Sequence, residues 1–343
     1  MMRLPLPWLL ALTTAALALL LLGSLATGPM ALTLSESLRA IYAGQGSGIA
    51  AHKLLIVQEI RLPRSLLCIA VGGILGLCGA VMQGLFRNPL ADPGIIGVSG
   101  GAALGAALAI VLLAPLGQSL QQQLGVGLLP LLAFLGGALT TTLVYLLGTR
   151  EGGTSVTVML LAGVAITALS GAVIGLLSYL ADDQMLRDLS LWQMGTLAAG
   201  KPADMVLALL TLATLLWLFM RDANPLNALL LGEGEARHLG IDVQALKRRL
   251  ILLTAAGVGV AVAVSGMIGF VGLVVPHLVR LLAGPNHVRL LPLSALMGSA
   301  LLLGADMLAR TLLAPAELPV GIITALLGAP FFIWLLIKSR RAL

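Results

Sequence analysis

Residues 60–101, IRLPRSLLCIAVGGILGLCGAVMQGLFRNPLADPGIIGVSGG, decide the fold of this chain. Two arginines, Arg61 and Arg64, lie at the entrance of an apolar helix, and the polar turn RNPLADP, residues 87–93, lies at its far end. A second apolar stretch, rich in small residues, follows at once. In so hydrophobic a chain this order predicts a helix that crosses a bilayer, a turn and a return. The arginines and the turn are therefore expected on opposite sides of a membrane.

The composition of the whole chain also indicates a membrane protein. Of its 343 residues, 59% are hydrophobic and only 10% are charged, whereas soluble domains carry about 25% charged residues. The 41 glycines favour close helix packing in lipid. The net charge of +6 does not indicate a nucleic-acid partner, because the lysines and arginines lie mainly between apolar runs, where membrane topology explains them. The expected surroundings are membrane lipid.

Runs of about 20 apolar residues, the length that crosses a bilayer, predict ten spans and hence an all-α polytopic membrane protein. Two of the spans, residues 94–114 and 271–284, are short and rich in Gly or Pro. The N-terminal run is longer than the core of a secretory signal, so we interpret it as a retained first span. The remaining spans are residues 7–27, 63–85, 127–148, 156–181, 203–220, 250–269, 290–309 and 319–337.

The distribution of positive charge predicts the orientation. Most of the 20 lysines and arginines fall on the side of the two termini, and an excess of positive charge marks the cytoplasmic side. Both termini are therefore expected in the cytoplasm, together with the largest cytoplasmic loop, residues 221–249. We expect residues 1–343 to form a single transmembrane domain.

Motifs for catalysis are missing from the sequence. It has no G-x-x-x-x-G-K-[ST] phosphate loop and no H-E-x-x-H metal motif, and the four histidines lie apart without ligand spacing. Cys68 and Cys78 fall in one predicted helix, about 15 Å apart along its axis, which is too far for a disulfide. We therefore expect neither an enzyme, nor a bound cofactor, nor a metal site in this chain.

Two cytoplasmic segments are candidates for function. In the turn 87–93 the two prolines bias Asn88 and Asp92 toward extended backbone, so the helix must end before Asn88. Leu90 is unusual in an ordinary water-facing turn, so an ordinary turn and a functional constriction both remain open. In the loop 221–249, LLLGEGEARHLGID predicts a short amphipathic helix at the membrane surface. This helix is either a solvated connector or a docking helix for a cytoplasmic partner.

A third candidate consists of Arg61, Arg64 and Arg310, which all fall at external span ends. One interpretation is that their side chains reach the membrane interface. The other is that they face outward and receive carboxylates of an external protein. Asp306 lies four residues before Arg310, and we favour a structural role for it as an intramembrane acid shielded by a helix pair.

Five segments of the sequence resemble one known family. They are RLPR, GAVMQGLFRNPLADPGIIGVSGGA, LGEGEARHLG, GFVGLVVPHLVR and AELPVGIITALLGAPFFIWLL, and they are similar, in this order, to the permease subunits of bacterial ABC importers for iron chelates, haem and vitamin B12 (FecCD-type). The resemblance implies the type II ABC importer permease fold, a ten-span homodimer in the inner membrane. It also implies two cytoplasmic ATPase subunits, which carry ATP and Mg²⁺, and a periplasmic binding protein.

The resemblance assigns roles at matching positions. It implies that the binding protein docks on Arg61, Arg64 and Arg310. A cytoplasmic gate near the dimer axis is implied for Asn88, Leu90, Thr154 and Ser155. The coupling helix that contacts the ATPase is implied for the stretch from Leu231 to Gly240, with Leu231, Gly232, Glu233, Ala236, Arg237, Leu239 and Gly240 as its main residues.

The mechanism implied is alternating access, with catalysis left to the ATPase. The sequence around residues 59–107 resembles haem permeases more than the B12 or hydroxamate branches. We therefore place haem first as the substrate, a ferric siderophore second and cobalamin third. A different class, an ion-coupled secondary transporter, usually places paired ionisable residues in the membrane. Asp306 is the strongest candidate for such a role in this chain.

Overall fold

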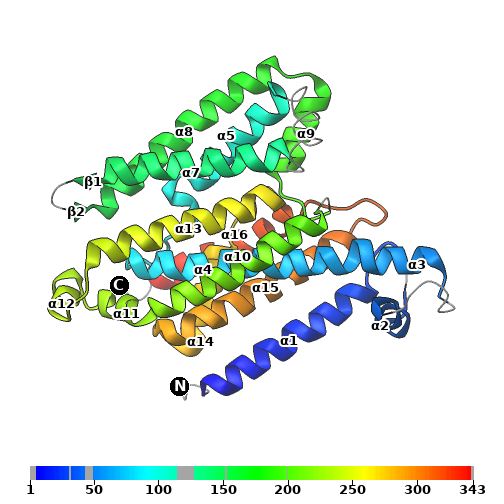
Figure 1. Ribbon diagram of the computed structural model, residues 1–343, viewed down its shortest axis with the longest axis horizontal. Coiled ribbons are helices and arrows are strands. Elements are labelled where there is room, and N and C mark those ends of the chain that lie inside the picture. The colour runs from blue at the N-terminus through cyan, green and yellow to red at the C-terminus, as the bar shows by residue number, and fades with distance from the viewer. Residues whose placement is uncertain are drawn as a thin grey trace.

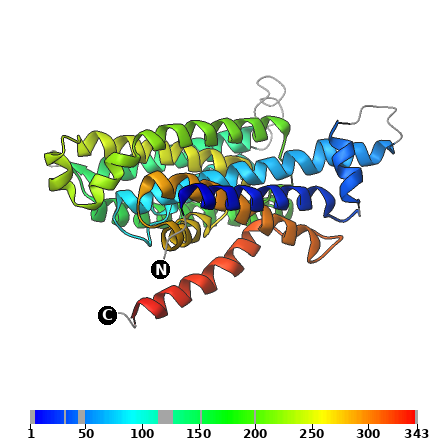
Figure 2. The same cartoon turned by 90° about the horizontal axis from the view of Figure 1, so that it is seen from below.

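The computed structural model describes residues 5–30, 32–42, 49–113, 127–150, 153–198 and 200–340, and these residues form a long bundle of helices (Figures 1 and 2). The elements in chain order are α1 (Leu6–Ala26), α2 (Leu34–Tyr42), α3 (Ala51–Leu55), the π-helix η1 (Ile56–Arg61), α4 (Leu62–Leu85), the 3₁₀-helix η2 (Pro93–Ile96), α5 (Val98–Val111), α7 (Leu128–Gly148), β1 (Thr149–Arg150), β2 (Gly153–Thr154), α8 (Val156–Leu180), α9 (Asp183–Gln193), α10 (Pro202–Arg221), α11 (Ala223–Leu230), α12 (Glu233–His238), α13 (Val243–Ser265), α14 (Val271–Ala283), α15 (His287–Thr311) and α16 (Val320–Arg340).

Every span predicted from the sequence coincides with a helix, which confirms the all-α membrane fold. Within the described residues, seven helices are long and apolar enough to cross a membrane, and three shorter apolar helices lie at Val98–Val111, Val271–Ala283 and Val320–Leu335. Outward-facing leucines of α1, α8 and α10, such as Leu19, Leu161 and Leu210, are exposed. A membrane supplies the apolar surroundings that these side chains require.

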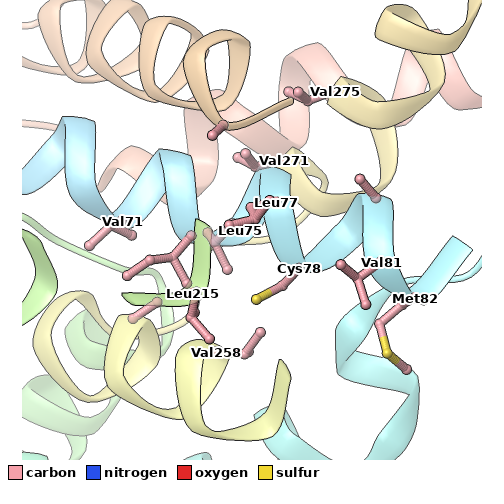
Figure 3. Packing of buried hydrophobic residues seen from close by; sticks show 14 of the residues in the cluster. Val71, Leu75, Leu77, Cys78, Val81, Met82, Leu215, Val258, Val271 and Val275 are labelled. Carbon is pink, nitrogen blue, oxygen red and sulfur yellow. The ribbon is translucent and has the colours of Figure 1, made fainter. Parts of the chain in front are cut away.

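Helix α4 forms the centre of the bundle. Its residues are buried almost throughout, and it contacts α15, α10, α14 and α13. A helix that is hydrophobic on all sides is expected to be buried in this way. Figure 3 shows Cys78 of α4 among Leu215 of α10, Val258 of α13 and Val271 of α14. Helix α13 also contacts α7, so it joins this centre to the layer of α5, α7 and α8 (Figure 1).

Glycines allow the central helices to approach closely. A Cβ added at Gly79 of α4 would overlap the backbone carbonyl of Gly272 in α14, and one added at Gly72 would overlap that of Gly298 in α15. Small residues at helix crossings are how membrane helices gain packing in lipid. These positions therefore set the distance between α4 and its neighbours.

Two predicted boundaries are wrong. The helix predicted at residues 63–85 continues backward without a break through η1 to Ala51. Pro63 lacks the N–H of a regular helical bond, and the wider π turn of η1 just before it, closed by the N–H of Leu62 on the carbonyl of Val57, lets the helix continue. The span predicted at 250–269 begins at Val243, where Asp242 caps the helix by accepting from the N–H groups of Gln244 and Ala245.

Candidate functional site

The candidate residues divide between the two ends of the bundle. The three arginines belong to η1, the start of α4 and the end of α15, which lie at the end of the bundle with α2 and α3 (Figure 1). The hairpin β1–β2 and helix α12 lie at the opposite end, and both terminal labels lie nearer this end in both views (Figures 1 and 2). The predicted separation of the arginine group from the gate and coupling segments along the molecule is thus present in the fold.

Arg61 forms hydrogen bonds with backbone carbonyls at and just after the end of α1. Its Nη1 donates to the carbonyls of Leu25 at 2.7 Å and Ala26 at 3.0 Å, and its Nη2 donates to that of Met30. The last carbonyls of a helix have no partner within it, and a basic side chain can satisfy them. The side chain of Arg61 is thus bound to the backbone of its own chain.

Arg64 and Arg310 enclose Asp306. The Nε and Nη2 atoms of Arg64 donate to Oδ1 of Asp306 at 3.0 and 2.8 Å, and its Nη1 donates to Oε2 of Glu317 at 2.7 Å. Nε of Arg310 lies 3.0 Å from Oδ2 of Asp306 in an ion pair without hydrogen-bond alignment. Nη2 of Arg310 donates to Oγ of Ser24 at 2.7 Å. A fully buried carboxylate requires such partners, and the shielding pair expected between Asp306 and Arg310 is present.

One of the two interpretations expected the arginines to face outward, and in the structure they do not. Arg61, Arg64 and Arg310 are only 3%, 7% and 3% exposed, because the end of α1 and the buried carboxylate of Asp306 draw them inward. We call the three arginines with Asp306 and Glu317 the arginine cluster. Glu317, in the connection between α15 and α16, is its partly exposed member, with 34% side-chain exposure. The docking role of the arginines itself stays a prediction.

The turn after α4 has the form that its prolines predict. Helix α4 ends at Leu85, before Asn88, and the side chain of Asn88 accepts from the N–H of Leu90 at 2.9 Å. Asp92 caps η2 by accepting from the N–H of Gly94 at 2.7 Å. Burial raises the pKa of the Asp92 carboxyl, and the bond from Gly94 opposes that rise. Asn88 and Leu90 are exposed on this turn, and their gate role stays a prediction.

The other two residues predicted for the gate, Thr154 and Ser155, lie at the end of the hairpin β1–β2. Strands β1 and β2 pair antiparallel with Thr149 opposite Thr154, and Ser155 caps α8 with its hydroxyl on the N–H of Val158 at 3.5 Å. Thr154 is buried. Its N–H donates to Oε1 of Gln244 at 3.1 Å, and its carbonyl accepts from Nζ of Lys247 at 3.1 Å. The hairpin is therefore held by two side chains of α13.

The short helix predicted in the loop 221–249 is present as α12, preceded by α11. Gly232 and Gly240, at φ +125° and +81°, border it with backbone conformations that suit glycine. Ala236 is the one fully buried residue of α12, while Leu231 and Leu239 beside it are 69% and 64% exposed. Arg237 is exposed as well. Helix α12 and the two leucines beside it thus present apolar and charged side chains, Glu235 among them, at this end of the bundle.

The loop itself is shorter than predicted, because residues 243–249 belong to α13. Arg249 forms an ion pair with the buried Asp222, and Lys247 forms one with Glu233, with Nζ 2.7 Å from Oε1. In the sequence, the basic run 247–249 indicates only the cytoplasmic side of the membrane, so Lys247 and Gln244 are not among the residues predicted for a site. The signal was helical spacing, since Lys247 lies four residues after the buried Val243 and three before the buried Leu250.

A hollow lies between α12, the hairpin and the start of α13. Its lining includes Tyr145, Thr149, Arg237, Gln244 and Arg248. Two of these side chains are cationic and Asp242 also lines the hollow, so its cations outnumber its one acid. Sequence patterns alone do not bring these residues of four elements, α7, β1, α12 and α13, together.

Comparison with known proteins identifies the family of this arrangement. Residues 16–338 match the model of the FecCD transport family. The chain is 46% identical over 328 residues to the hemin transport system permease protein HmuU of Yersinia pestis, covering 95% of this chain and 94% of that protein. It is 43% identical over 285 residues to the vitamin B12 import system permease protein BtuC of Vibrio cholerae, covering 83% of each.

Two solved structures share the fold. One, described as an inward-facing conformation of a metal-chelate type ABC transporter, aligns over 97% of this chain and 99% of its own with a TM-score of 0.83 and 34% identity. The other, PsaBC from Streptococcus pneumoniae, aligns over 88% of this chain with a TM-score of 0.57 and 19% identity, a likeness of fold alone.

Proposed function

The chain belongs to the FecCD transport family, and we propose that it is the permease subunit of an ATP-driven importer that moves haem from a periplasmic binding protein to the cytoplasm. It carries out no catalysis itself. In this proposal two copies of the chain lie in the bacterial inner membrane with their termini in the cytoplasm. Two ATPase subunits bind ATP and Mg²⁺ and hydrolyse the nucleotide.

The observation that carries the proposal is the difference between the two ends of the bundle. One end presents α12 with its buried anchor Ala236 and its exposed Arg237, flanked by the exposed leucines Leu231 and Leu239. Apolar residues at the margins of a short helix suit docking into a groove of a protein partner. The other end carries the arginine cluster. A permease has to contact an energy source on one face of the membrane and a substrate donor on the other. The difference between the two ends of the bundle supports both contacts.

Docking of the binding protein would act on the arginine cluster through Glu317. Nη1 of Arg64 is bound to this carboxylate, which is partly exposed, whereas the Asp306 bonds are buried. A carboxylate of the docking protein would have to replace Glu317, since the other donors of Arg64 are engaged in the interior. Arg61 and Arg310 would hold α1 in place around this contact.

Haem is the substrate that the relatives support best. The HmuU protein, which is named for hemin transport, aligns with this chain over 94% of the HmuU length at 46% identity. A ferric siderophore and cobalamin are the alternatives, the latter supported by the BtuC relatives. An ion-coupled secondary transporter is less well supported, because Asp306 is held by two arginines and is buried. A carboxylate so paired is not free to take up a coupling ion.

Reconstitution tests this proposal. The chain is expressed with an ATPase and a binding protein of the same bacterium, purified in detergent and placed in liposomes. We expect the ATPase to co-purify, and haem uptake to require both ATP and the binding protein. Cobalamin and a ferric siderophore serve as competing substrates. Uptake that continues without ATP, or that follows an imposed proton or sodium gradient, would contradict the importer function.

A further inference from the structure

Lys247 is a charged side chain in an unusual place. It belongs to α13 and is only 2% exposed, among the largest fully buried side chains of the described residues. A buried ammonium group is costly unless it is paired and hydrogen-bonded. Its neighbours Arg248 and Arg249 on the same helix are exposed. The burial of Lys247 therefore depends on the partners that its Nζ atom finds.

Those partners come from two different segments. Nζ of Lys247 donates to Oε1 of Glu233 in α12 at 2.7 Å and to the carbonyl of Thr154 in β2 at 3.1 Å. The ammonium thus joins the helix proposed to meet the ATPase with the hairpin proposed to gate the pathway. Glu233 lies 14 residues before Lys247 in the sequence, and Thr154 lies 93 residues before it.

On the hairpin side of this junction, several contacts join the strands to each other and to α13. Gln244, one turn before Lys247, accepts from the N–H of Thr154 at 3.1 Å. A Cβ added at Gly153 would fall 2.5 Å from Nε2 of Gln244, so the hairpin backbone lies directly against α13. Thr149 and Thr154 are also joined by their hydroxyl groups at 3.1 Å. A small movement of α13 here has to move the hairpin too.

The α12 side depends on the ion pair of Lys247. Arg237 lies 3.8 Å from Glu233, but both side chains are exposed enough for solvent to screen the pair. Glu233 is thereby bound mainly by the buried Lys247. If α12 moved away alone, the ammonium would lose its only carboxylate partner among the described residues while still buried, which is strongly unfavourable. Helix α12 and the hairpin are therefore expected to move together.

From this geometry we propose that Lys247 is the positioning residue that transmits displacement of α12 to the Thr154 hairpin, so that ATPase movement and gate movement stay coupled. This inference rests on the proposed function, in which α12 docks on the ATPase. Lys247 contacts neither nucleotide nor substrate. Its role is to keep a fixed link between two segments that would otherwise touch different partners.

The test measures haem transported per ATP hydrolysed in the reconstituted complex. We expect Lys247→Met to lower this ratio on the order of tenfold, within the usual range of coupling between two protein sites. The matched control is Arg289→Met, which removes a partly exposed charge at the start of α15, outside the α12–hairpin junction, and should keep the wild-type ratio. Lys247→Arg retains donors for Glu233 and Thr154 and should recover much of the ratio. Such a recovery is not expected if Lys247→Met acts only through lost packing.

A double variant isolates the pair itself. Glu233→Gln should lower the ratio, and adding it to Lys247→Met should lower the ratio no further, because residues that act through one contact are not additive. Glu233→Gln also serves if Lys247→Met fails to assemble, since Glu233 is partly exposed and its replacement is nearly the same size. A wild-type ratio in Glu233→Gln, or fully additive losses in the double variant, would overturn the inference.

Failure of the inference is distinguishable from failure of the proposed function. If wild-type uptake does not depend on ATP, the proposed function fails before any variant is compared. If wild-type uptake is driven by ATP and Lys247→Met retains the wild-type ratio, the importer function stands and the role of Lys247 is refuted.

Discussion

Replacement of Asp306 by asparagine tests the arginine cluster most directly. The carboxylate is fully buried between Arg64 and Arg310, so Asp306→Asn leaves two buried guanidinium groups without their shared anion. Removing one partner of a buried ion pair costs about 3–5 kcal/mol. Asparagine keeps one carbonyl oxygen as an acceptor for Arg64, and Glu317 remains, so we expect the lower end, about 3 kcal/mol.

The assay follows unfolding in mixed detergent micelles through the two free cysteines. Cys68 and Cys78 are buried, so their thiols react only when α4 loses its packing. A loss of about 3 kcal/mol corresponds to an unfolding constant on the order of 100-fold larger. The matched control is Glu317→Gln, which removes the partly exposed partner of the same arginine and should cost no more than about 1 kcal/mol. Equal effects of the two substitutions would refute the view that burial makes Asp306 the central anion.

Further predictions concern packing, pH and the dimer. Gly79→Ala should destabilise the protein by about 1–3 kcal/mol or more, because the added Cβ overlaps the backbone of α14. The control is Gly304→Ala, whose Cβ would meet no atom within 4 Å. In the same thiol assay it should be neutral or slightly stabilising. Hydrogen bonds from Lys53 and, after it, from Thr33 lower the pKa of Glu36 from 4.5 to about 2. The stabilisation that they give to the α2–α3 region is therefore complete above pH 4.5 and is lost as pH falls toward 2. Lys53→Met should move the pKa of Glu36, followed by ¹³C NMR, part of the way back toward 4.5. In the proposed homodimer, Thr154→Cys in both copies should crosslink across the two-fold axis, and failure with reagents of several lengths would oppose the proposed gate position.

Apolar length and turn chemistry were sufficient to predict the spans. Helices α1 and α7 begin and end within about two residues of the predicted limits, because each is a long apolar run bordered by Pro or Gly. The end of α4 before Asn88 followed from the prolines alone. The short helix α12 was likewise visible in the pattern of its loop.

Features that depend on distant contacts were not predictable in this way. Arg64 and Glu317, or Lys247 and Thr154, meet only after the helices pack, and no local period indicates such pairs. The basic run at 247–249 resembles a membrane border, yet one of its side chains is buried and another binds Asp222. Arginines at a span end likewise look exposed in sequence, and the packing of α1 against α15 turns them inward.

The placement of the two ends on opposite faces of the membrane is tested by the accessibility of single cysteines. Tyr42 at the end of α2 is 91% exposed, and Glu235 of α12 is exposed at the other end of the bundle. The native cysteines are buried and give little background. With a thiol reagent that does not cross membranes, Tyr42→Cys should react in intact spheroplasts, and Glu235→Cys should react only in inverted vesicles. Reaction of both variants from the same side would contradict the importer topology.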